Sequence, residues 1–203
     1  MTSIVYTKSY SAPPIDRREA LRYAGVRGNS PDASLMLDEC IAECENILAF
    51  RLCYGEFPLT RVENFLDFGF GRVKSAKLAE HLSGCSSVIV VAATLGIGID
   101  RLISKYSRLS QTKALILQGL GAERIEALLD LFSEEQEREK TKHGMAHTAR
   151  FSAGYGDLPL ELQREIFKAL DCERNIGLTL NDSLLMSPTK SVTAIIGIKK
   201  DKK

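Results

Sequence analysis

The stretch "SSVIVVAATLGIGIDRLISKY", residues 86–106, contains the clearest change of secondary structure in the chain. Its first half is a run of β-branched and small apolar residues, which is typical of a buried strand. The second half, from Ile99 onward, carries apolar residues at helical spacing. The stretch therefore predicts a strand followed directly by a helix, with Gly96 and Gly98 at the join.

Outside this unit, helices and strands follow one another without steady alternation. Helices are expected over residues 13–25, 30–48, 75–85, 109–142 and 160–170, and strands over 50–57, 61–70 and 191–198. The strands 50–57 and 61–70 are compatible with a hairpin. A doubly wound parallel sheet needs regular β-α alternation, so the order favours an α+β fold. We expect a single domain over residues 1–203 with a mixed or antiparallel twisted sheet packed by helices, an N-terminal extended segment over 1–15 and a basic tail over 199–203.

Two details of the helices can be checked against a structure. Asp16 can cap the first helix, with Glu19 three residues later as in a capping box and Gly25 at the end. The longest helical pattern, 109–142, contains no proline, but Gly119 and Gly121 can bend or break it.

Composition restricts the classes of partner. The formal net charge of +1 over 203 residues gives no electrostatic reason to expect nucleic acid or an anionic membrane as the main partner. The longest apolar run, "VIVVAA", is too short to cross a bilayer, and the N-terminus does not look like a signal peptide. Five cysteines without repeated spacing indicate buried thiols in a reducing compartment, so a cytoplasmic location is expected.

Three patterns invite a functional interpretation but have a simpler structural one. Gly96 and Gly98 could cradle a phosphate, yet the third glycine of the dinucleotide fingerprint is missing and a tight turn explains them. His143 and His147 have zinc-ligand spacing, but no glutamate follows the first histidine, and we expect no metal site. Cys40 and Cys44, four apart on a predicted helix, fit one-sided burial.

The segment "RFSAGYGDLP", residues 150–159, is too irregular for a helix or strand and carries chemically useful residues. Arg150 offers a planar fork for a carboxylate, Gly154 lets a ligand approach the backbone, and Tyr155 supplies a flat face and a hydroxyl. These residues suit a small zwitterionic or aromatic ligand. Equally, the segment can be a turn in which Arg150 makes a structural salt bridge and Tyr155 fills the core.

This segment resembles the activation domain of cobalamin-dependent methionine synthase, whose hallmark is Arg-x-x-x-Gly-Tyr followed by proline. Here the motif runs from Arg150 to Tyr155, with Gly156 in the place of the proline. The stretch "IGLTLNDSLLMSPTKSV", residues 176–192, is similar to the family's corresponding stretch at Gly177, Leu180, Ser183, Met186, Pro188, Ser191 and Val192. The segments "IDRREALRYAG" and "AATLGIGID" resemble shorter, free-standing relatives of that domain.

The resemblance implies a binding site for S-adenosylmethionine. Arg150 would hold the ligand's carboxylate, the backbone around Ser152 and Gly154 would meet the adenosine part, and Tyr155 would lie against the ligand. Asp16, which also fits a helix cap, is the candidate for the ligand's amino group. The family's tyrosine-rich segment has no counterpart here, because the chain reaches Ile198 and then only a few lysines.

The implied function is a component of a methionine synthase-type system rather than a complete enzyme, with no catalytic side chain of its own. The sequence lacks the Asp-x-His-x-x-Gly corrinoid motif. A corrinoid-dependent methyltransferase, with methionine synthase favoured, would therefore carry the cobalamin and be reactivated in trans while an electron donor, such as its reductase, reduces the cobalt. Two alternatives stay open: a docking or regulatory subunit without a functional ligand site, and a self-sufficient methyltransferase that uses "AATLGIGID".

Overall fold

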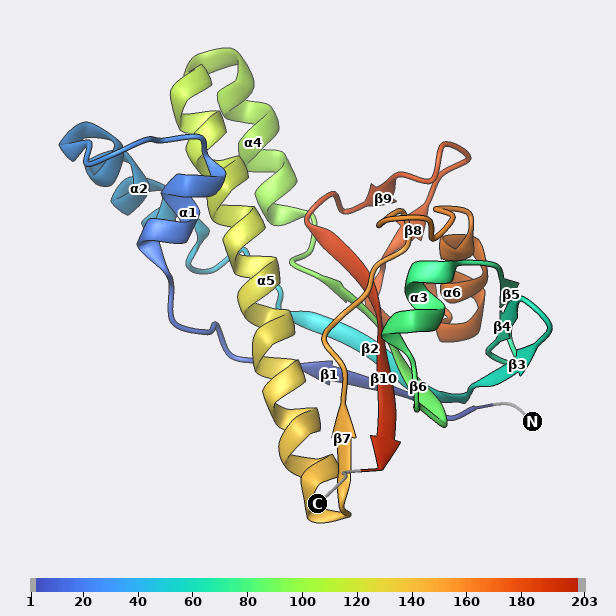
Figure 1. The fold of residues 1–203 in the computed structure, drawn as a ribbon. Coiled ribbons are helices and arrows are strands. Elements are labelled where there is room, and N and C mark those ends of the chain that lie inside the picture. The colour runs from blue at the N-terminus through green and yellow to red at the C-terminus, as the bar shows by residue number, and fades with distance from the viewer. Residues whose placement is uncertain (1–2, 201–203) are drawn as a thin grey trace.

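The computed structural model describes residues 3–200, and its centre is a five-stranded sheet in the order β1-β2-β6-β10-β7 (Figure 1). The strands are β1 (Val5–Ser9), β2 (Arg51–Pro58), β6 (Ser87–Thr94), β7 (Met145–His147) and β10 (Ser191–Lys200). Every neighbouring pair in this sheet is antiparallel. The α+β fold expected from the sequence is therefore confirmed, with its sheet in the antiparallel form.

The central strands are apolar on both faces because both faces are covered. Successive side chains of a strand point to opposite sides. Val91 of β6 and Ala194 of β10 belong to the core on one side of the sheet, while Val90 and Ile195 belong to the core on the other. This double burial explains why "VIVVAA" reads as an unbroken apolar run.

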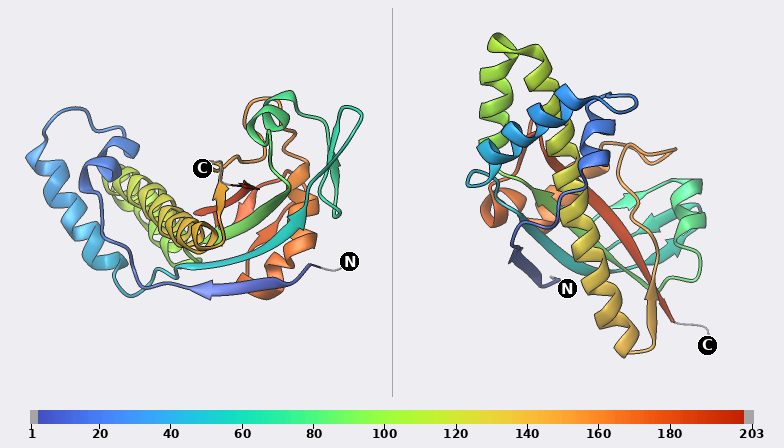
Figure 2. Two further views of the ribbon diagram at one scale, coloured as in Figure 1. Left: turned by 60° about the horizontal axis from the view of Figure 1, so that its bottom comes forward. Right: turned by 90° about the vertical axis from the view of Figure 1, so that its left-hand side faces the viewer.

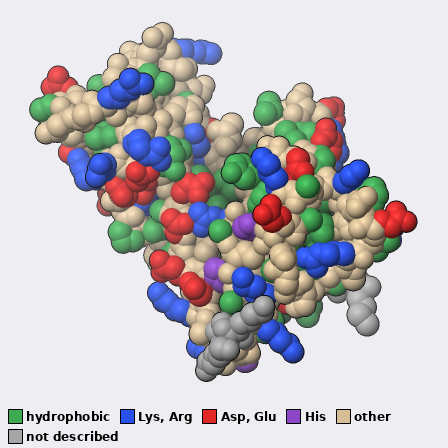
Figure 3. All heavy atoms as spheres, in the orientation of Figure 1, with side chains coloured by type: hydrophobic (Ala, Val, Ile, Leu, Met, Phe, Trp, Pro, Cys, Tyr) green, Lys and Arg blue, Asp and Glu red, His purple; other side chains and the backbone are tan. Residues whose placement is uncertain are grey.

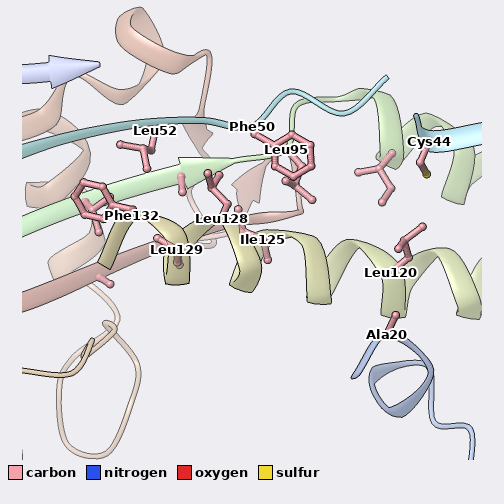
Figure 4. Close-up of a cluster of buried hydrophobic side chains, with 14 of the residues drawn as sticks. Ala20, Cys44, Phe50, Leu52, Leu95, Leu120, Ile125, Leu128, Leu129 and Phe132 are labelled. Carbon is pink, nitrogen blue, oxygen red and sulfur yellow. The ribbon is translucent and has the colours of Figure 1, made fainter. Parts of the chain in front are cut away.

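One face of the sheet is covered mainly by α5, a helix of 32 residues. The helices on this side are α1 (Arg17–Tyr23), α2 (Pro31–Cys44), α4 (Gly98–Leu109) and α5 (Gln111–Lys142). Leu128 and Phe132 of α5 pack on Leu52 of β2, and Leu120 lies near Ala20 of α1 (Figure 4). One long helix therefore joins the sheet to the N-terminal helices.

The other face is covered by shorter elements. Its helices are α3 (Ala76–His81), α6 (Leu162–Leu170) and α7 (Cys172–Ile176). A three-stranded sheet lies on this side, made of β3 (Thr60–Val62), β4 (Phe65–Asp67) and β5 (Arg72–Val73), and β8 (Thr179–Leu180) pairs with β9 (Met186–Ser187). Among residues 3–200, no helix is both long and apolar enough to span a bilayer.

The glycines of α5 do not break it, since the helix is continuous from Gln111 to Lys142, and they serve as contact points. A Cβ on Gly119 would lie 2.4 Å from the carbonyl oxygen of Ala20 in α1. A Cβ on Gly121 would lie 2.8 Å from Cδ1 of Ile99 in α4. The missing side chains let α1 and α4 approach α5 closely.

Most predicted elements are present, and the differences have local causes. The helix expected over 30–48 ends at Cys44, because a turn brings the Ile47 carbonyl against Gly98. The hairpin expected between strands 50–57 and 61–70 does not form, since β2 pairs with β1 and β6. Instead, β4 pairs antiparallel with both β3 and β5. The extended segment 1–15 contains β1, whereas β7 and α7 were not predicted. Of the expected basic tail, residues 199–200 end β10 and 201–203 lie outside the described residues.

Candidate functional site

A groove of about 460 Å³ runs along α5 where the N-terminal segment and α1 lie against it. The residues that line it on α5 include Glu123, Glu126, Asp130 and Glu134. Residues three or four apart share one face of a helix, so these carboxylates form a single stripe. Figure 3 shows acidic side chains gathered over this part of α5. The groove wall is therefore lined with carboxylates that are held in ion pairs: Glu123 pairs with Arg124, Glu126 and Asp130 share Arg150, and Glu134 pairs with Arg138.

Arg150 borders this groove through direct bonds to its wall. Its Nη1 donates to Asp130 Oδ1 at 2.7 Å and to Ser133 Oγ at 3.2 Å, and its Nη2 donates to Glu126 Oε2 at 2.9 Å. The side chain is 24% exposed, so it is anchored but reachable. The interpretation of Arg150 as a salt-bridge residue is confirmed, and its partners are residues of the groove.

Asp16 lines the same groove from the opposite wall. Its Oδ1 accepts from the Glu19 backbone N–H at 3.0 Å, which confirms the predicted cap of α1. The reciprocal half of the capping box is absent: the Asp16 N–H donates to Glu123 Oε1 at 3.0 Å, and the Glu19 carboxylate pairs with Arg22. The fold therefore brings Asp16 into the lining of the groove and Arg150 onto two carboxylates of its other wall, although Arg150 is not itself a lining residue.

Ser152, Gly154 and Tyr155 form a tight turn just beyond Arg150 and do not line the groove itself. Gly154 has φ +85°, a left-handed conformation that favours glycine. The Tyr155 ring is 67% exposed and makes an edge contact with Phe151 at 5.2 Å between centroids. Tyr155 does not fill the core, as one interpretation held, because Phe151 occupies that place.

The segment that contains Arg150 is fixed at both ends. Phe151 exchanges backbone hydrogen bonds of 2.9 and 2.8 Å with Ile195 of β10. At the far end, Asp157 caps α3 by accepting from the Ser75 hydroxyl and the Ala76 N–H, and these bonds, that of Ser75 foremost, hold its pKa below the ordinary value. In the left view of Figure 2 the segment after β7 lies between α5 and α3. The turn is therefore a defined platform beside the groove.

The glycines of "AATLGIGID" are explained by packing. Gly96 has φ +75°, and a Cβ on Gly98 would lie 2.4 Å from the Ile47 carbonyl oxygen. Backbone therefore closes the N-terminal end of α4, and Asp100 in its first turn accepts from the Thr189 N–H at 3.1 Å. This environment does not favour a phosphate.

The histidines and cysteines considered as metal ligands or thiols have surroundings explained by the fold. His147 places its ring nitrogens 2.8 Å from the Thr148 carbonyl oxygen and 3.3 Å from that of Ser133. No cluster of three or more metal-ligating side chains occurs in the part of the chain that the structure describes. The predicted burial of the thiols is confirmed at Cys40, Cys44, Cys53, Cys85 and Cys172. Burial raises the pKa of Cys40 to about 11 and that of Cys44 to about 12.

The sequence analysis missed the acidic wall of the groove. Its signal is present, since Glu126, Asp130 and Glu134 recur every four residues. A charged stripe on a long helix is usually only a solvated face, however. Its role becomes visible only when α1 and Arg150 are placed beside it.

Comparison with known proteins identifies related chains. Residues 78–203, more than half of the chain, match the family described as vitamin B12 dependent methionine synthase, activation domain. No curated protein matches the sequence. Among solved structures, the crystal structure of the MetH reactivation domain bound to AdoHcy superposes with a TM-score of 0.69 at 20% identity, covering 98% of this chain and 79% of that one. At this identity the structural match supports the fold, and the family match confirms the resemblance found in the sequence.

Proposed function

The chain belongs to the family of vitamin B12-dependent methionine synthase activation domains, and we propose that it binds S-adenosylmethionine between α5, α1 and the segment that follows Arg150. A groove of about 460 Å³ falls within the size range of ordinary small-molecule sites. The solved relative is bound to AdoHcy, the demethylated form of this ligand, which supports the proposed ligand class.

The observation that carries the proposal is that Asp16 lines the groove while Arg150 is bonded to carboxylates of its other wall. An amino-acid group has a carboxylate and an ammonium, and the two side chains offer one partner for each. Arg150 uses Nη1 and Nη2 for its protein contacts, and its Nε makes no hydrogen bond within residues 3–200. Asp16 uses only Oδ1 for the helix cap. Each side chain therefore keeps polar atoms for a ligand.

The charge of the wall supports a cationic ligand. S-adenosylmethionine carries a sulfonium, an ammonium and a carboxylate, whereas S-adenosylhomocysteine lacks the sulfonium charge. The carboxylates of Glu126, Asp130 and Glu134 line the groove beside the site proposed for the amino-acid group. Glu126 and Asp130 share the single positive charge of Arg150, and Glu134 pairs with Arg138, so a net negative charge remains at the wall. This net charge favours the methylated ligand over the demethylated one by Coulomb attraction.

The turn after Arg150 would hold the rest of the ligand. Gly154 and Gly156 have left-handed backbone conformations, and Gly154 has no side chain to keep a ligand from the backbone. The exposed Tyr155 ring offers a flat face for an aromatic base or for the sulfonium. We assign the adenosine side of the ligand to Ser152, Gly154 and Tyr155.

The proposed role is reactivation in trans of a cobalamin-dependent methyltransferase, with methionine synthase as the favoured target. S-adenosylmethionine would supply the methyl group, and the partner would carry the cobalamin. The residues of this chain would bind and orient the ligand so that its methyl group faces the partner, which is catalysis by proximity rather than by a reactive side chain. An electron donor, such as the partner's reductase, completes the system.

Calorimetric titration with S-adenosylmethionine tests the binding site. We expect saturable binding by the unchanged chain and at least about tenfold weaker binding by Arg150→Ala, since about tenfold corresponds to ~1.4 kcal/mol, a modest charged hydrogen bond. Arg108→Ala is the matched control, because Arg108 lies exposed on α4, away from the groove. Equal affinity in Arg150→Ala would reject the site assignment. No binding by the unchanged chain, alone or with a corrinoid partner, would reject the proposed function and favour a docking role.

A reconstitution assay tests the role in trans. A cobalamin-dependent methionine synthase that lacks its own activation domain is inactivated by oxidation and then supplied with S-adenosylmethionine, an electron donor and this protein. We expect methionine formation to recover with the unchanged chain and with Arg108→Ala, and not with Arg150→Ala. Recovery that does not depend on this protein would contradict the role.

A further inference from the structure

We infer that the buried pair Glu123–Arg124 is a positioning device that places Asp16 for the ligand. The inference rests on the proposed function, because it assigns a role to residues that hold one wall of the proposed site. Neither residue was singled out by the sequence, and folding has no general need for a buried ion pair, since well-packed apolar residues often replace one without loss of stability.

The pair is unusual in its burial and its geometry. Neighbouring residues on a helix point about 100° apart and do not normally face each other. Here Arg124 turns back onto its neighbour: Nε donates to Glu123 Oε2 at 2.5 Å and Nη2 donates to Oε1 at 2.6 Å. The two residues are only 4% and 1% exposed. A desolvated two-bond pair of this kind holds a fixed orientation.

The remaining bonds of the pair go to the chain just before α1. Arg124 Nη1 donates to the Pro13 carbonyl at 2.5 Å, and Nη2 donates to the Pro14 carbonyl at 2.6 Å. Glu123 Oε1 accepts from the Asp16 N–H at 3.0 Å. Three backbone groups within four residues are therefore bound to one buried ion pair, and two of them belong to prolines, whose backbone is already stiff.

These contacts of Glu123 and Arg124, together called the clamp, hold the backbone before α1 and leave Oδ2 of Asp16 available to a ligand. Asp16 is exposed and lines the groove, while its backbone is held from below by Glu123. About one and two turns further along α5, Glu126 and Asp130 hold Arg150. A single helix thus fixes both partners of the ligand's amino-acid group, and Arg124 is the positioning residue on the Asp16 side.

A double-mutant cycle tests the inference. Arg124→Lys keeps the buried charge but loses the fork that reaches Glu123 and two carbonyls together. We expect Arg124→Lys alone to weaken S-adenosylmethionine binding about fivefold to tenfold. Added to Asp16→Asn, the same change should weaken binding less than about twofold, because the effects of coupled residues are not additive. Arg108→Lys, an exposed arginine-to-lysine change on α4, is the control and should leave the affinity unchanged.

Hydrogen exchange supplies a second readout that does not require the ligand. Arg124→Lys should speed amide exchange in residues 15–18, the first amides after the two prolines, while the buried middle of α5 stays protected, which separates a loosened clamp from general unfolding. Unchanged affinity, or an equal loss of affinity in the Asp16→Asn background, would overturn the inference and leave the proposed function intact. Absence of binding by the unchanged chain would overturn both.

Discussion

Replacing Gly119 with alanine should displace α1 and weaken both the fold and the ligand site. The new Cβ would lie 2.4 Å from the Ala20 carbonyl oxygen, 2.5 Å from the Ala24 nitrogen and 2.7 Å from the Ala24 Cβ. Two of these atoms are backbone, so they cannot rotate away and α1 itself must move. Overpacking of this kind costs about 1–3 kcal/mol, and better helix propensity returns about 1 kcal/mol. The expected net loss is at most about 2 kcal/mol.

Thermal unfolding followed by circular dichroism measures this loss. In a chain of this length each kcal/mol lowers the unfolding temperature by roughly 2–4 °C. Because Asp16 caps α1, the same shift should also weaken S-adenosylmethionine binding. Gln118→Ala, an exposed neighbour on α5, controls for helix propensity. Unfolding of Gly119→Ala at or above the temperature of the unchanged chain, with unaltered affinity, would refute the predicted displacement of α1.

Three further predictions concern charge and burial. Raising the salt concentration from about 50 to about 200 mM should weaken binding of S-adenosylmethionine more than that of S-adenosylhomocysteine, because salt screens the exposed acidic wall. If calorimetry shows the same salt dependence for both affinities, the wall does not select the methylated ligand by its charge. The pKa of Asp157 is lowered in the folded chain, so its contribution to stability is present above the ordinary carboxyl range and is lost as pH falls through the lower folded value. Denaturant unfolding at several pH values should therefore show a smaller acid-dependent loss in Asp157→Asn, and identical pH profiles would refute this role. Native thiol labelling near pH 8 should be slow at Cys40 and Cys44, with their raised pKa values of about 11 and 12, and fast in denaturant; rapid native labelling would contradict their burial.

Helix starts and the buried strand were predicted well from the sequence. Asp16, Ser30 and Ser75 stand at the starts of helices and each accepts a backbone hydrogen bond there. The buried strand β6 was visible because both of its faces are apolar. Signals of this kind depend on neighbouring residues, so they can be found in a sequence.

What the sequence could not give depends on contacts between distant segments. The short strand β7 exists because its residues pair with the end of β10. Gly119 was interpreted as a possible break, whereas its lack of a side chain is what admits α1. The motif identified Arg150, but its carboxylate partners on α5 follow from tertiary packing alone.

A crystal structure of the complex tests most directly whether S-adenosylmethionine binds between Asp16 and Arg150, as proposed. We expect the ligand carboxylate within hydrogen-bond distance of the Arg150 guanidinium, the amino group beside Asp16 and the adenosine against the turn from Ser152 to Tyr155. A ligand bound instead at the Gly96–Gly98 turn, with the groove along α5 left to solvent, would contradict this proposal.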